Sequence, residues 1–521
     1  MNTSIYKSQL KKSFLIKSLA LFSLLAFVAV PGLASAVTYG TPITINNPAP
    51  ATYYDQFGPS LFGNSLSMDG NMFVVSAPHQ ADSVTYNAGF AYLYDATTGD
   101  ILHVFSDPTP HHDGNFASSI SISNDKVLIS DQKDSVAHLF DATTGALLRT
   151  FKKPQSSSVG NAFGGPVYLS GDKVLIGDTG HTVSGYNSAG AAYLFDATTG
   201  ALLRTFENPI PWAYEYDHFG ISLYVSGDKV LIGVPYKNFS GHDAGSAYLF
   251  DATTGALLQI FWNPTPSSYD YFGKSVFISG DKIWISAPGD DTAAINAGSV
   301  YIYDASTGVL LQTLSGPPIS NFGESMSVSD DKVLISGKPG IAALYSATTS
   351  ALLQTFNDPT SSENGGFAHS ISMSGDKILI SEPWTNTEAV GIGSVYLYLP
   401  LPDTDGDGIA DSADNCPADA NADQIDTDGD GQGNPCDFTP NGDTDGDGVD
   451  NLADNCPGVY NPGQEDNDGD GIGNVCDPTP DGDPDPNPTS IDQCKQLGWI
   501  DFAFRNQGQC VAFVNTGHDG R

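Results

Sequence analysis

The chain has 521 residues and a formal net charge of −39, with 60 acidic residues against 21 Lys and Arg. A chain of this length holds more than one domain, and its charge disfavours nucleic acid and anionic membranes as partners. The charge is uneven: residues 401–490 contain 24 Asp or Glu and no Lys, Arg or His. Such a block repels itself, so it folds only if a cation neutralises it.

The first residues have the pattern of a secretory signal. Four lysines lie within the first 17 residues, an apolar run spans residues 19–30, and Ala34-Ser35-Ala36 has the small residues of a cleavage site. The apolar run is short for a membrane span. The sequence therefore predicts a signal peptide over residues 1–36. The mature chain is expected to be secreted or held at the cell surface, without a membrane span.

A repeat with a period of roughly 42 to 55 residues follows. One half of it is a segment such as "YLFDATTGALLQIF", which begins at Tyr248. The other half begins with Phe-Gly or Phe-Ala, as in "FGISLYVSGDKVLIGVP" from Phe219. The seven starts are Phe62, Phe116, Phe163, Phe219, Phe272, Phe322 and Phe367.

Each repeat predicts four short antiparallel strands. Alternation such as Ile-Ser-Leu-Tyr-Val indicates a strand with one buried face, and "SGDK" is a hairpin turn. "KVLIG", "AGSAYLFD" and "ALLQIF" supply three more strands, the last two joined by "ATTG". Four such strands form one propeller blade. The fold class predicted for residues 37–400 is therefore an all-β, seven-bladed β-propeller.

The seventh repeat lacks its last strand, because it stops at Pro400. The segment Tyr39–Pro50 has the pattern of that missing strand. We therefore expect the mature N-terminus to complete the seventh blade and close the ring, which removes free strand edges.

The Phe-Gly starts, the Ala287-Pro288 pair and strands such as "AGSAYLF" resemble the FG-GAP repeats of integrin α-subunits. The resemblance implies an extracellular propeller that recognises a ligand. These blades lack the Asp-rich calcium loops of some integrin blades, so no calcium is predicted there. The "DATTG" units also resemble quinoprotein dehydrogenase blades, but Phe residues such as Phe206 replace the usual Trp. We interpret DATTG as a turn whose Asp and Thr bond to their own backbone.

Four twelve-residue segments starting at Asp403, Asp426, Asp443 and Asp466 share one pattern. Each has Asp at positions 1, 3, 5 and 12, Gly at position 6, and Asp or Asn at position 9. Calcium takes six to eight oxygen ligands, and Gly at position 6 allows the chain to curl around the ion. Position 7 offers a backbone carbonyl. The predicted metal ligands are Asp403, Asp405, Asp407, Ile409, Asp411, Asp414, Asp426, Asp428, Asp430, Gln432, Asp437, Asp443, Asp445, Asp447, Val449, Asp454, Asp466, Asp468, Asp470, Ile472 and Asp477.

EF-hand and dockerin modules are disfavoured because no helix pattern follows the loops. Asp414–Asp437 and Asp454–Asp477 instead resemble thrombospondin type 3 repeats, and we assign residues 401–480 to such an array. The resemblance implies little regular secondary structure, wrapped around about four or more Ca²⁺ ions. Calcium binding and folding would then be one event.

All six cysteines lie after residue 415, and they allow 15 pairings. Cys416 to Cys436 and Cys456 to Cys476 are each 20 residues apart and flank alternate loops, which favours sequential pairing. A zinc site is disfavoured by this wide spacing. Residues 481–490 are expected to be a Pro/Asp linker. Residues 491–521 are expected to be a small module stapled by Cys494 and Cys510, whose aromatic residues Trp499, Phe502 and Phe504 could form a docking patch.

The propeller histidines recur at no fixed position in the repeat, so the sequence predicts no catalytic site. The expected function is that of a secreted or cell-surface calcium-binding protein. Its propeller would bind an extracellular protein or carbohydrate ligand, in adhesion or recognition, and the array would be a calcium-stabilised stalk. The alternative is an exported propeller enzyme, a quinoprotein-like dehydrogenase or a hydrolase, with a cofactor or clustered polar groups on its axial face.

Overall fold

The computed structural model describes residues 37–48, 60–81, 85, 87–154, 162–211, 216–318, 320–338, 340–360, 365–384, 393–480, 490–492, 494–495 and 507–516. Val37–Pro402 forms one compact unit, and Asp403–Arg521 belongs to a second. The predicted signal peptide, nearly all of the linker, and Trp499, Phe502 and Phe504 of the C-terminal module lie outside the described residues.

The first unit consists of seven four-stranded antiparallel sheets. The first two sheets contain β2 (Leu66–Asp69), β3 (Met72–Ala77), β4 (Phe90–Asp95), β5 (Ile101–Ser106), β6 (Ile120–Ser123), β7 (Lys126–Asp131), β8 (Val136–Asp141) and β9 (Leu147–Lys152). The third and fourth contain β10 (Phe163–Ser170), β11 (Lys173–Asp178), β12 (Ala191–Asp196), β13 (Leu202–Glu207), β14 (Ser222–Ser226), β15 (Lys229–Val234), β16 (Ser246–Asp251) and β17 (Leu257–Trp262). The fifth and sixth contain β18 (Val276–Ser279), β19 (Lys282–Ala287), β20 (Ser299–Asp304), β21 (Leu310–Ser315), β22 (Met326–Ser329), β23 (Lys332–Gly337), β24 (Ile341–Ser346) and β25 (Leu352–Asn357). The seventh contains β26 (Ile371–Ser374), β27 (Lys377–Glu382), β28 (Ser394–Tyr398) and β1 (Ile43–Asn46).

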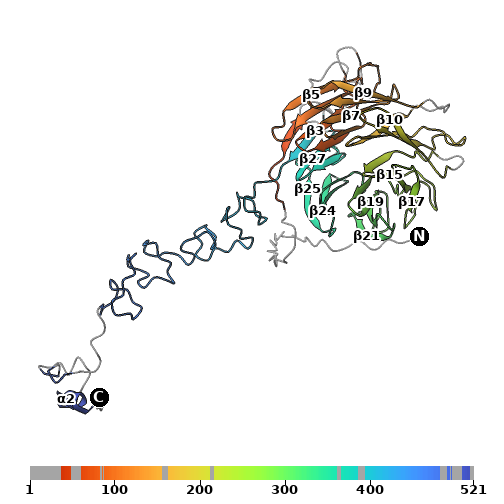
Figure 1. Cartoon of the computed structure of the whole chain (residues 1–521). Helices are drawn as coiled ribbons and strands as arrows, with labels where there is room; N and C mark the ends of the chain where they lie inside the picture. Colours follow the sequence, from red (N-terminus) through yellow and green to blue (C-terminus); the bar gives the residue numbers. More distant parts are fainter. Residues whose placement is uncertain are drawn as a thin grey trace, which may run out of the picture. The chain divides into compact units, whose positions relative to one another are not determined.

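The seven sheets form a closed ring (Figure 1). The first strand of each sheet contacts the first strand of the next, and β26 of the last sheet contacts β2 of the first. In the seventh sheet β1 pairs with β28, with Ile43 opposite Leu397 and Ile45 opposite Val395. The predicted all-β, seven-bladed propeller is therefore confirmed, with its last blade built from both ends of the propeller segment.

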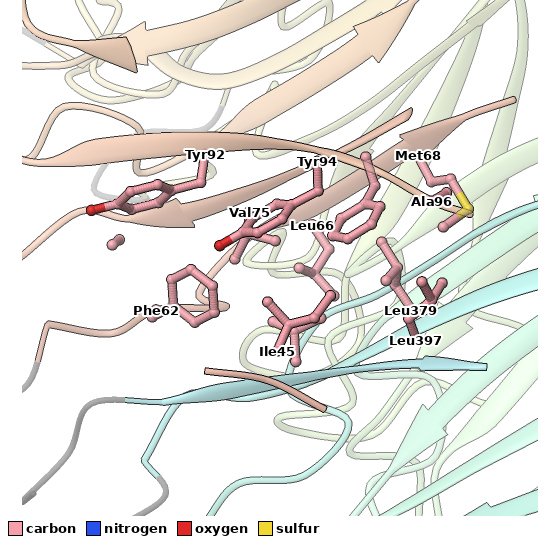
Figure 2. Packing of buried hydrophobic residues seen from close by; sticks show 13 residues of the cluster. Ile45, Phe62, Leu66, Met68, Val75, Tyr92, Tyr94, Ala96, Leu379 and Leu397 are labelled. Carbon is pink, nitrogen blue, oxygen red and sulfur yellow. The ribbon is translucent and has the colours of Figure 1, made fainter. Parts of the chain in front are cut away.

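The hydrophobic core lies between neighbouring blades. Figure 2 shows Ile45 and Leu397 of the seventh blade packed with Phe62 and Leu66 of the first, and all four side chains are buried. At the positions where quinoprotein blades carry Trp, Phe residues contact an aromatic ring of the next blade. One such pair is Phe105 and Phe140, with ring centroids 4.8 Å apart. Ring closure therefore buries apolar surface as well as pairing strands.

The Phe-Gly starts dock against the glycine that precedes the third strand of the previous blade. Gly245 has a φ of +88°, and a Cβ there would lie 2.1 Å from the carbonyl oxygen of Phe272. Phe272 itself is fully buried. Only glycine fits so close an approach in this conformation, which explains why "AG" and "FG" recur together in the sequence.

Serines on the innermost strands link adjacent blades. These strands have one edge that no strand of their own sheet covers. Ser121 of β6 accepts a hydrogen bond of 3.0 Å from Leu169 N of β10, and Ser372 of β26 accepts one of 3.0 Å from Met68 N of β2. The hydroxyls therefore satisfy backbone N–H groups that would otherwise remain unpaired inside the ring.

The DATTG segments are hairpin turns held by their own Asp and Thr. Asp251 Oδ1 accepts hydrogen bonds from Thr253 N at 2.9 Å, Thr254 N at 2.6 Å and Thr254 Oγ1 at 2.9 Å. Bonding from Thr254 lowers the pKa of Asp251, and equivalent bonds from Ser306 and Thr307 lower the pKa of Asp304 to about 2. The turn interpretation is confirmed.

The second unit has little regular structure. Residues 403–480 contain no α-helix or β-strand, and α2 (Gln507–Thr516) follows in the C-terminal module. In the described part of the chain no helix combines the length and hydropathy needed to cross a membrane.

Candidate calcium sites

The carboxylates at positions 1, 3 and 5 converge in each of the four acidic loops. One ligating oxygen from each of Asp403, Asp405 and Asp407 lies within 4.8 Å of the others. The same holds for the three other loops, whose residues are Asp426, Asp428, Asp430, Asp443, Asp445, Asp447, Asp466, Asp468 and Asp470. These are hard oxygen donors of the kind that calcium prefers.

Backbone hydrogen bonds fold each loop around its first aspartate. In the first loop Asp403 Oδ1 accepts from Gly406 N at 2.8 Å, and Oδ2 accepts from Gly408 N at 3.1 Å. Gly408 has a φ of +97°, which glycine adopts without strain. The sequence therefore builds the curl from Asp at position 1 and Gly at positions 4 and 6.

Several carboxylate oxygens are buried without a hydrogen-bond donor. They are Oδ2 of Asp405, Asp414, Asp437, Asp445 and Asp477, which occupy positions 3 and 12. Leaving a buried charged acceptor unpaired is unfavourable, and a cation relieves that penalty. Loss of hydration and the neighbouring Asp407 raise the pKa of Asp405, as the corresponding neighbours do in the other loops. The residues present therefore fit Ca²⁺ at all four loops.

The side chain at position 9 forms hydrogen bonds within its own loop. Both oxygens of Asp411 accept hydrogen bonds from Thr404, from its N–H at 2.7 Å and from its hydroxyl at 2.8 Å. In the second loop Asn434 Oδ1 accepts from Thr427 N at 3.0 Å, and Asn434 Nδ2 donates to the Thr427 hydroxyl at 2.8 Å. Asp411 thus holds the start of its loop by hydrogen bonds and lies outside the converging triad, and its role as a calcium ligand stays a prediction. The backbone carbonyls at position 7 remain predicted ligands.

The four loops form two similar units 40 residues apart, one from Asp403 to Asp437 and one from Asp443 to Asp477. In the first, Asn415 N donates to Gln424 Oε1 at 3.0 Å and Asp407 Oδ2 accepts from Asn421 N at 2.7 Å. Asn455, Gln464, Asp447 and Asn461 repeat this arrangement in the second. These amides were not predicted from the sequence, although their repetition at a fixed spacing was a usable signal.

A disulfide closes the second part of each unit. Cys416 is bonded to Cys436, Cys456 to Cys476, and in the C-terminal module Cys494 to Cys510. This is the sequential pairing that the spacing favours. Each of the first two disulfides closes a segment that contains nearly all of one acidic loop. The disulfide therefore restrains that loop before any ion binds.

The propeller has a pocket of about 480 Å³ at its third and fourth blades. Its lining residues are Thr179, Tyr216, His218, Ile221, Tyr236, Asn238, His242 and Asp243. His218 and Tyr236 meet edge to face with centroids 5.6 Å apart. His218 precedes β14 and His242 lies between β15 and β16 of the fourth blade, whereas Thr179 belongs to the third blade, so only the folded ring forms the pocket.

Comparison with known proteins supports both halves of this description. Residues 213–250 and 265–303 match the FG-GAP repeat family, and residues 402–424 and 425–464 match the thrombospondin type 3 repeat family. No curated protein matches the chain. Among solved structures, the computationally designed Ika8 protein is 16% identical, covers 66% of this chain and 96% of its own, and has a TM-score of 0.40. The chain thus combines FG-GAP repeats with calcium-binding repeats of the extracellular type.

Proposed function

We propose that this protein is a secreted or cell-surface recognition protein. Residues 403–478 form a calcium-folded stalk, and the propeller binds an extracellular carbohydrate. The proposal assigns no catalytic step to the propeller. The observation that carries it is the convergence of three carboxylates in each of four consecutive loops.

The stalk function follows from the charge of the array. Its carboxylates are held close together by backbone hydrogen bonds, and repulsion among them opposes that arrangement without a cation. Four or more Ca²⁺ ions remove the repulsion and rigidify the segment. Extracellular calcium is abundant enough for weak sites of this kind to be filled.

The recognition function is assigned to the pocket at the third and fourth blades. Tyr216 is 63% exposed, and its ring stacks near His218 with centroids 6.1 Å apart. An exposed aromatic ring can stack against the apolar face of a sugar, while Asn238 and Asp243 offer polar groups for its hydroxyls. A pocket lined by both kinds of group favours a carbohydrate over an apolar ligand.

The test is binding of the calcium-loaded full chain to a glycan array. We expect a subset of glycans to bind, and Tyr216→Ala to lower that binding at least tenfold. The matched control is Tyr460→Ala, since Tyr460 is equally exposed at 63% but lies in the acidic array. Absence of binding, or equal loss in both variants, would overturn the assignment of the pocket.

A further inference from the structure

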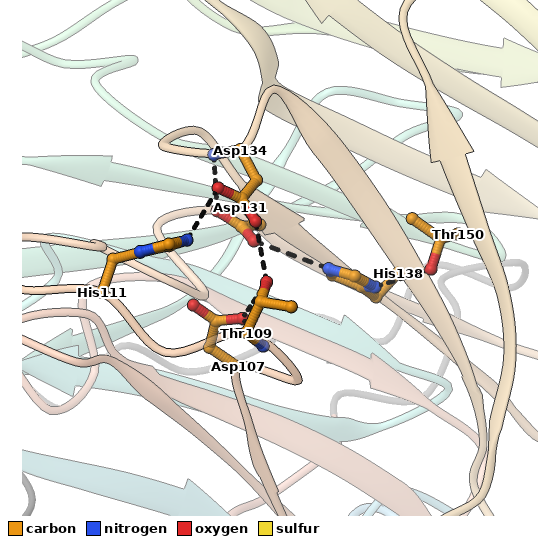
Figure 3. Close-up of polar contacts among 7 residues, drawn as sticks. All are labelled: Asp107, Thr109, His111, Asp131, Asp134, His138 and Thr150. Atoms are coloured by element: carbon orange, nitrogen blue, oxygen red, sulfur yellow. Dashed lines mark hydrogen bonds and ion pairs between the residues drawn. The ribbon is translucent and has the colours of Figure 1, made fainter.

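A second kind of metal site lies between the first and second blades. Asp107 follows β5 of the first blade, whereas Asp131 ends β7 and His138 lies in β8 of the second (Figure 3). Their exposed fractions are 5%, 0% and 4%, and one ligating atom of each lies within 4.8 Å of the others. Oδ2 of Asp107, Oδ2 of Asp131 and Nε2 of His138 are buried without a hydrogen-bond partner.

The remaining polar atoms of these three side chains are fixed by neighbours. Asp107 Oδ1 accepts from Thr109 N at 2.6 Å, and Asp131 Oδ1 accepts from Asp134 N at 3.2 Å. His138 Nδ1 lies 3.0 Å from Thr150 Oγ1. With its proton on Nδ1, the imidazole directs the Nε2 lone pair at the two carboxylates. Metal-ligating histidines are commonly oriented by such a bond from the other ring nitrogen.

Two other blade interfaces provide a partner for the carboxylate at the end of the second strand. Where Asp178 ends β11, Lys153 of the preceding blade forms an ion pair with it at 2.7 Å. Where Glu382 ends β27, the Tyr396 hydroxyl donates to it at 2.7 Å. His138 stands at the strand position that holds Tyr in five other blades, and Asp107 at the position of Lys153. Relative to the interface of Lys153, Asp178 and Tyr193, the first interface has a carboxylate in place of the ammonium group and an imidazole in place of the phenol.

Two buried carboxylates facing each other without a cation are strongly unfavourable. His138 Nε2 and Asp131 Oδ2 are 3.5 Å apart, which exceeds a normal hydrogen bond. It is about the separation of two ligands on one tetrahedral ion with bonds of roughly 2.0–2.2 Å. A divalent ion would satisfy all three unpaired atoms at once.

We propose that Asp107, Asp131 and His138 bind one divalent transition-metal ion, of the class that Zn²⁺ represents. Calcium is excluded because its ligands are oxygens, whereas zinc accepts imidazole nitrogen with carboxylate oxygen. Water completes the coordination, since three protein ligands leave one position open. The ion links two blades. This site goes beyond the proposed function, and the calcium array does not depend on it.

The experiment uses the full chain, stripped of metal and then saturated with calcium so that the acidic loops are filled. Zn²⁺ alone is then titrated by calorimetry, and thermal unfolding is recorded with and without one equivalent of zinc. We expect wild type to bind one more zinc than His138→Tyr, and zinc to raise only the wild-type unfolding temperature. Equal zinc uptake and equal shifts in both would show adventitious binding and overturn the proposal.

Two further variants keep the result decisive if His138→Tyr folds poorly. Asp107→Asn introduces the residue that Asn208 and Asn263 place at the equivalent position, and it should also lose one zinc. Thr150→Val should keep the site but weaken zinc binding by about 10–100-fold, and Co²⁺ bound there should retain visible absorption bands.

The matched control is His181→Gln, a buried histidine 3.8 Å from Asp178, which is already paired with Lys153. A loss of zinc in the control equal to that in Asp107→Asn would contradict the assignment.

Discussion

The hydroxyl of Ser394 donates a hydrogen bond of 2.9 Å to Asn46, although 348 residues separate the two in the chain. The bond accompanies the pairing of β28 with β1, which joins the two ends of the propeller segment. Closure by a strand from the opposite end makes the ring depend on a short segment, and every blade then has neighbours on both sides.

Ile45→Ala should destabilise the propeller by about 2–5 kcal/mol, the usual effect of truncating a buried isoleucine. Ile45 is 7% exposed and packs in the interface between the seventh and first blades. Ile43→Ala in the same strand is the control, since Ile43 is 38% exposed. The measurement is denaturant unfolding of the full chain, and equal effects of the two substitutions would show that β1 is not part of the core.

Ser372→Ala should lower stability by about 1–3 kcal/mol because it leaves Met68 N–H buried and unpaired. The bond between Ser372 and Met68 is buried, whereas the bond between Ser374 and Gly70 is exposed to water. Ser374→Ala therefore serves as the control, with an effect within about 0.5 kcal/mol. The measurement is the thermal unfolding of both variants. A clearly larger loss of stability in Ser372→Ala than in Ser374→Ala is expected, and equal losses would contradict the role assigned to Ser372.

The DATTG turns should make the propeller sensitive to acid. Hydrogen bonds within the turns lower the pKa of Asp141, Asp196, Asp251 and Asp304, the last to about 2. A carboxyl whose pKa is lower in the folded state stabilises that state above its unfolded pKa, and this stabilisation is lost as pH falls through the folded value. Unfolding temperatures should therefore fall between about pH 4 and pH 2.

Asp304→Asn should flatten that part of the pH profile, because the variant has no carboxyl to protonate. The sixth blade provides an internal comparison, since Ser346 replaces Asp there. Calorimetry of wild type and Asp304→Asn from pH 7 to pH 2 is the measurement. Parallel profiles for the two proteins would contradict the effect assigned to Asp304.

Removing one acidic triad should remove calcium without affecting the propeller. The double substitution of Asp428 and Asp430 by Ala deletes two converging carboxylates of the second loop. We expect equilibrium dialysis to show at least one Ca²⁺ fewer per chain. Asp423→Ala is the control, because Asp423 lies outside the triads and only accepts a hydrogen bond of 3.3 Å from Ile425 N.

Much of the fold could be predicted because recurring motifs show where the strands of each repeat begin and end. Seven Phe-Gly or Phe-Ala starts mark the beginnings of the blades, and Ser-Gly-Asp-Lys turns, DATTG turns and their variants mark the strand ends in most of them. The truncated seventh repeat also points to β1 as its missing strand. The serine contacts between blades could not be foreseen, because alternating serine in a strand has the pattern of a solvent-facing edge. Ser121 is instead 4% exposed and bonds to the next blade.

One kind of candidate site could be predicted from the sequence, and the other could not. The acidic triads are local in sequence, so spacing alone predicts which carboxylates meet. Asp107, Asp131 and His138 come from two blades, and only the closed ring brings them together. His138 was not predicted as a ligand because the propeller histidines recur at no fixed position, although it stands where five other blades have Tyr.

The central claim is that calcium folds residues 403–480. Hydrogen exchange of the full chain, compared between calcium-free and calcium-saturated states, tests it most directly. The account predicts that exchange in residues 403–480 slows strongly with calcium, including at the loop amides of Gly406 and Gly408, while the propeller strands are unchanged. Equal exchange of the array in both states would contradict it.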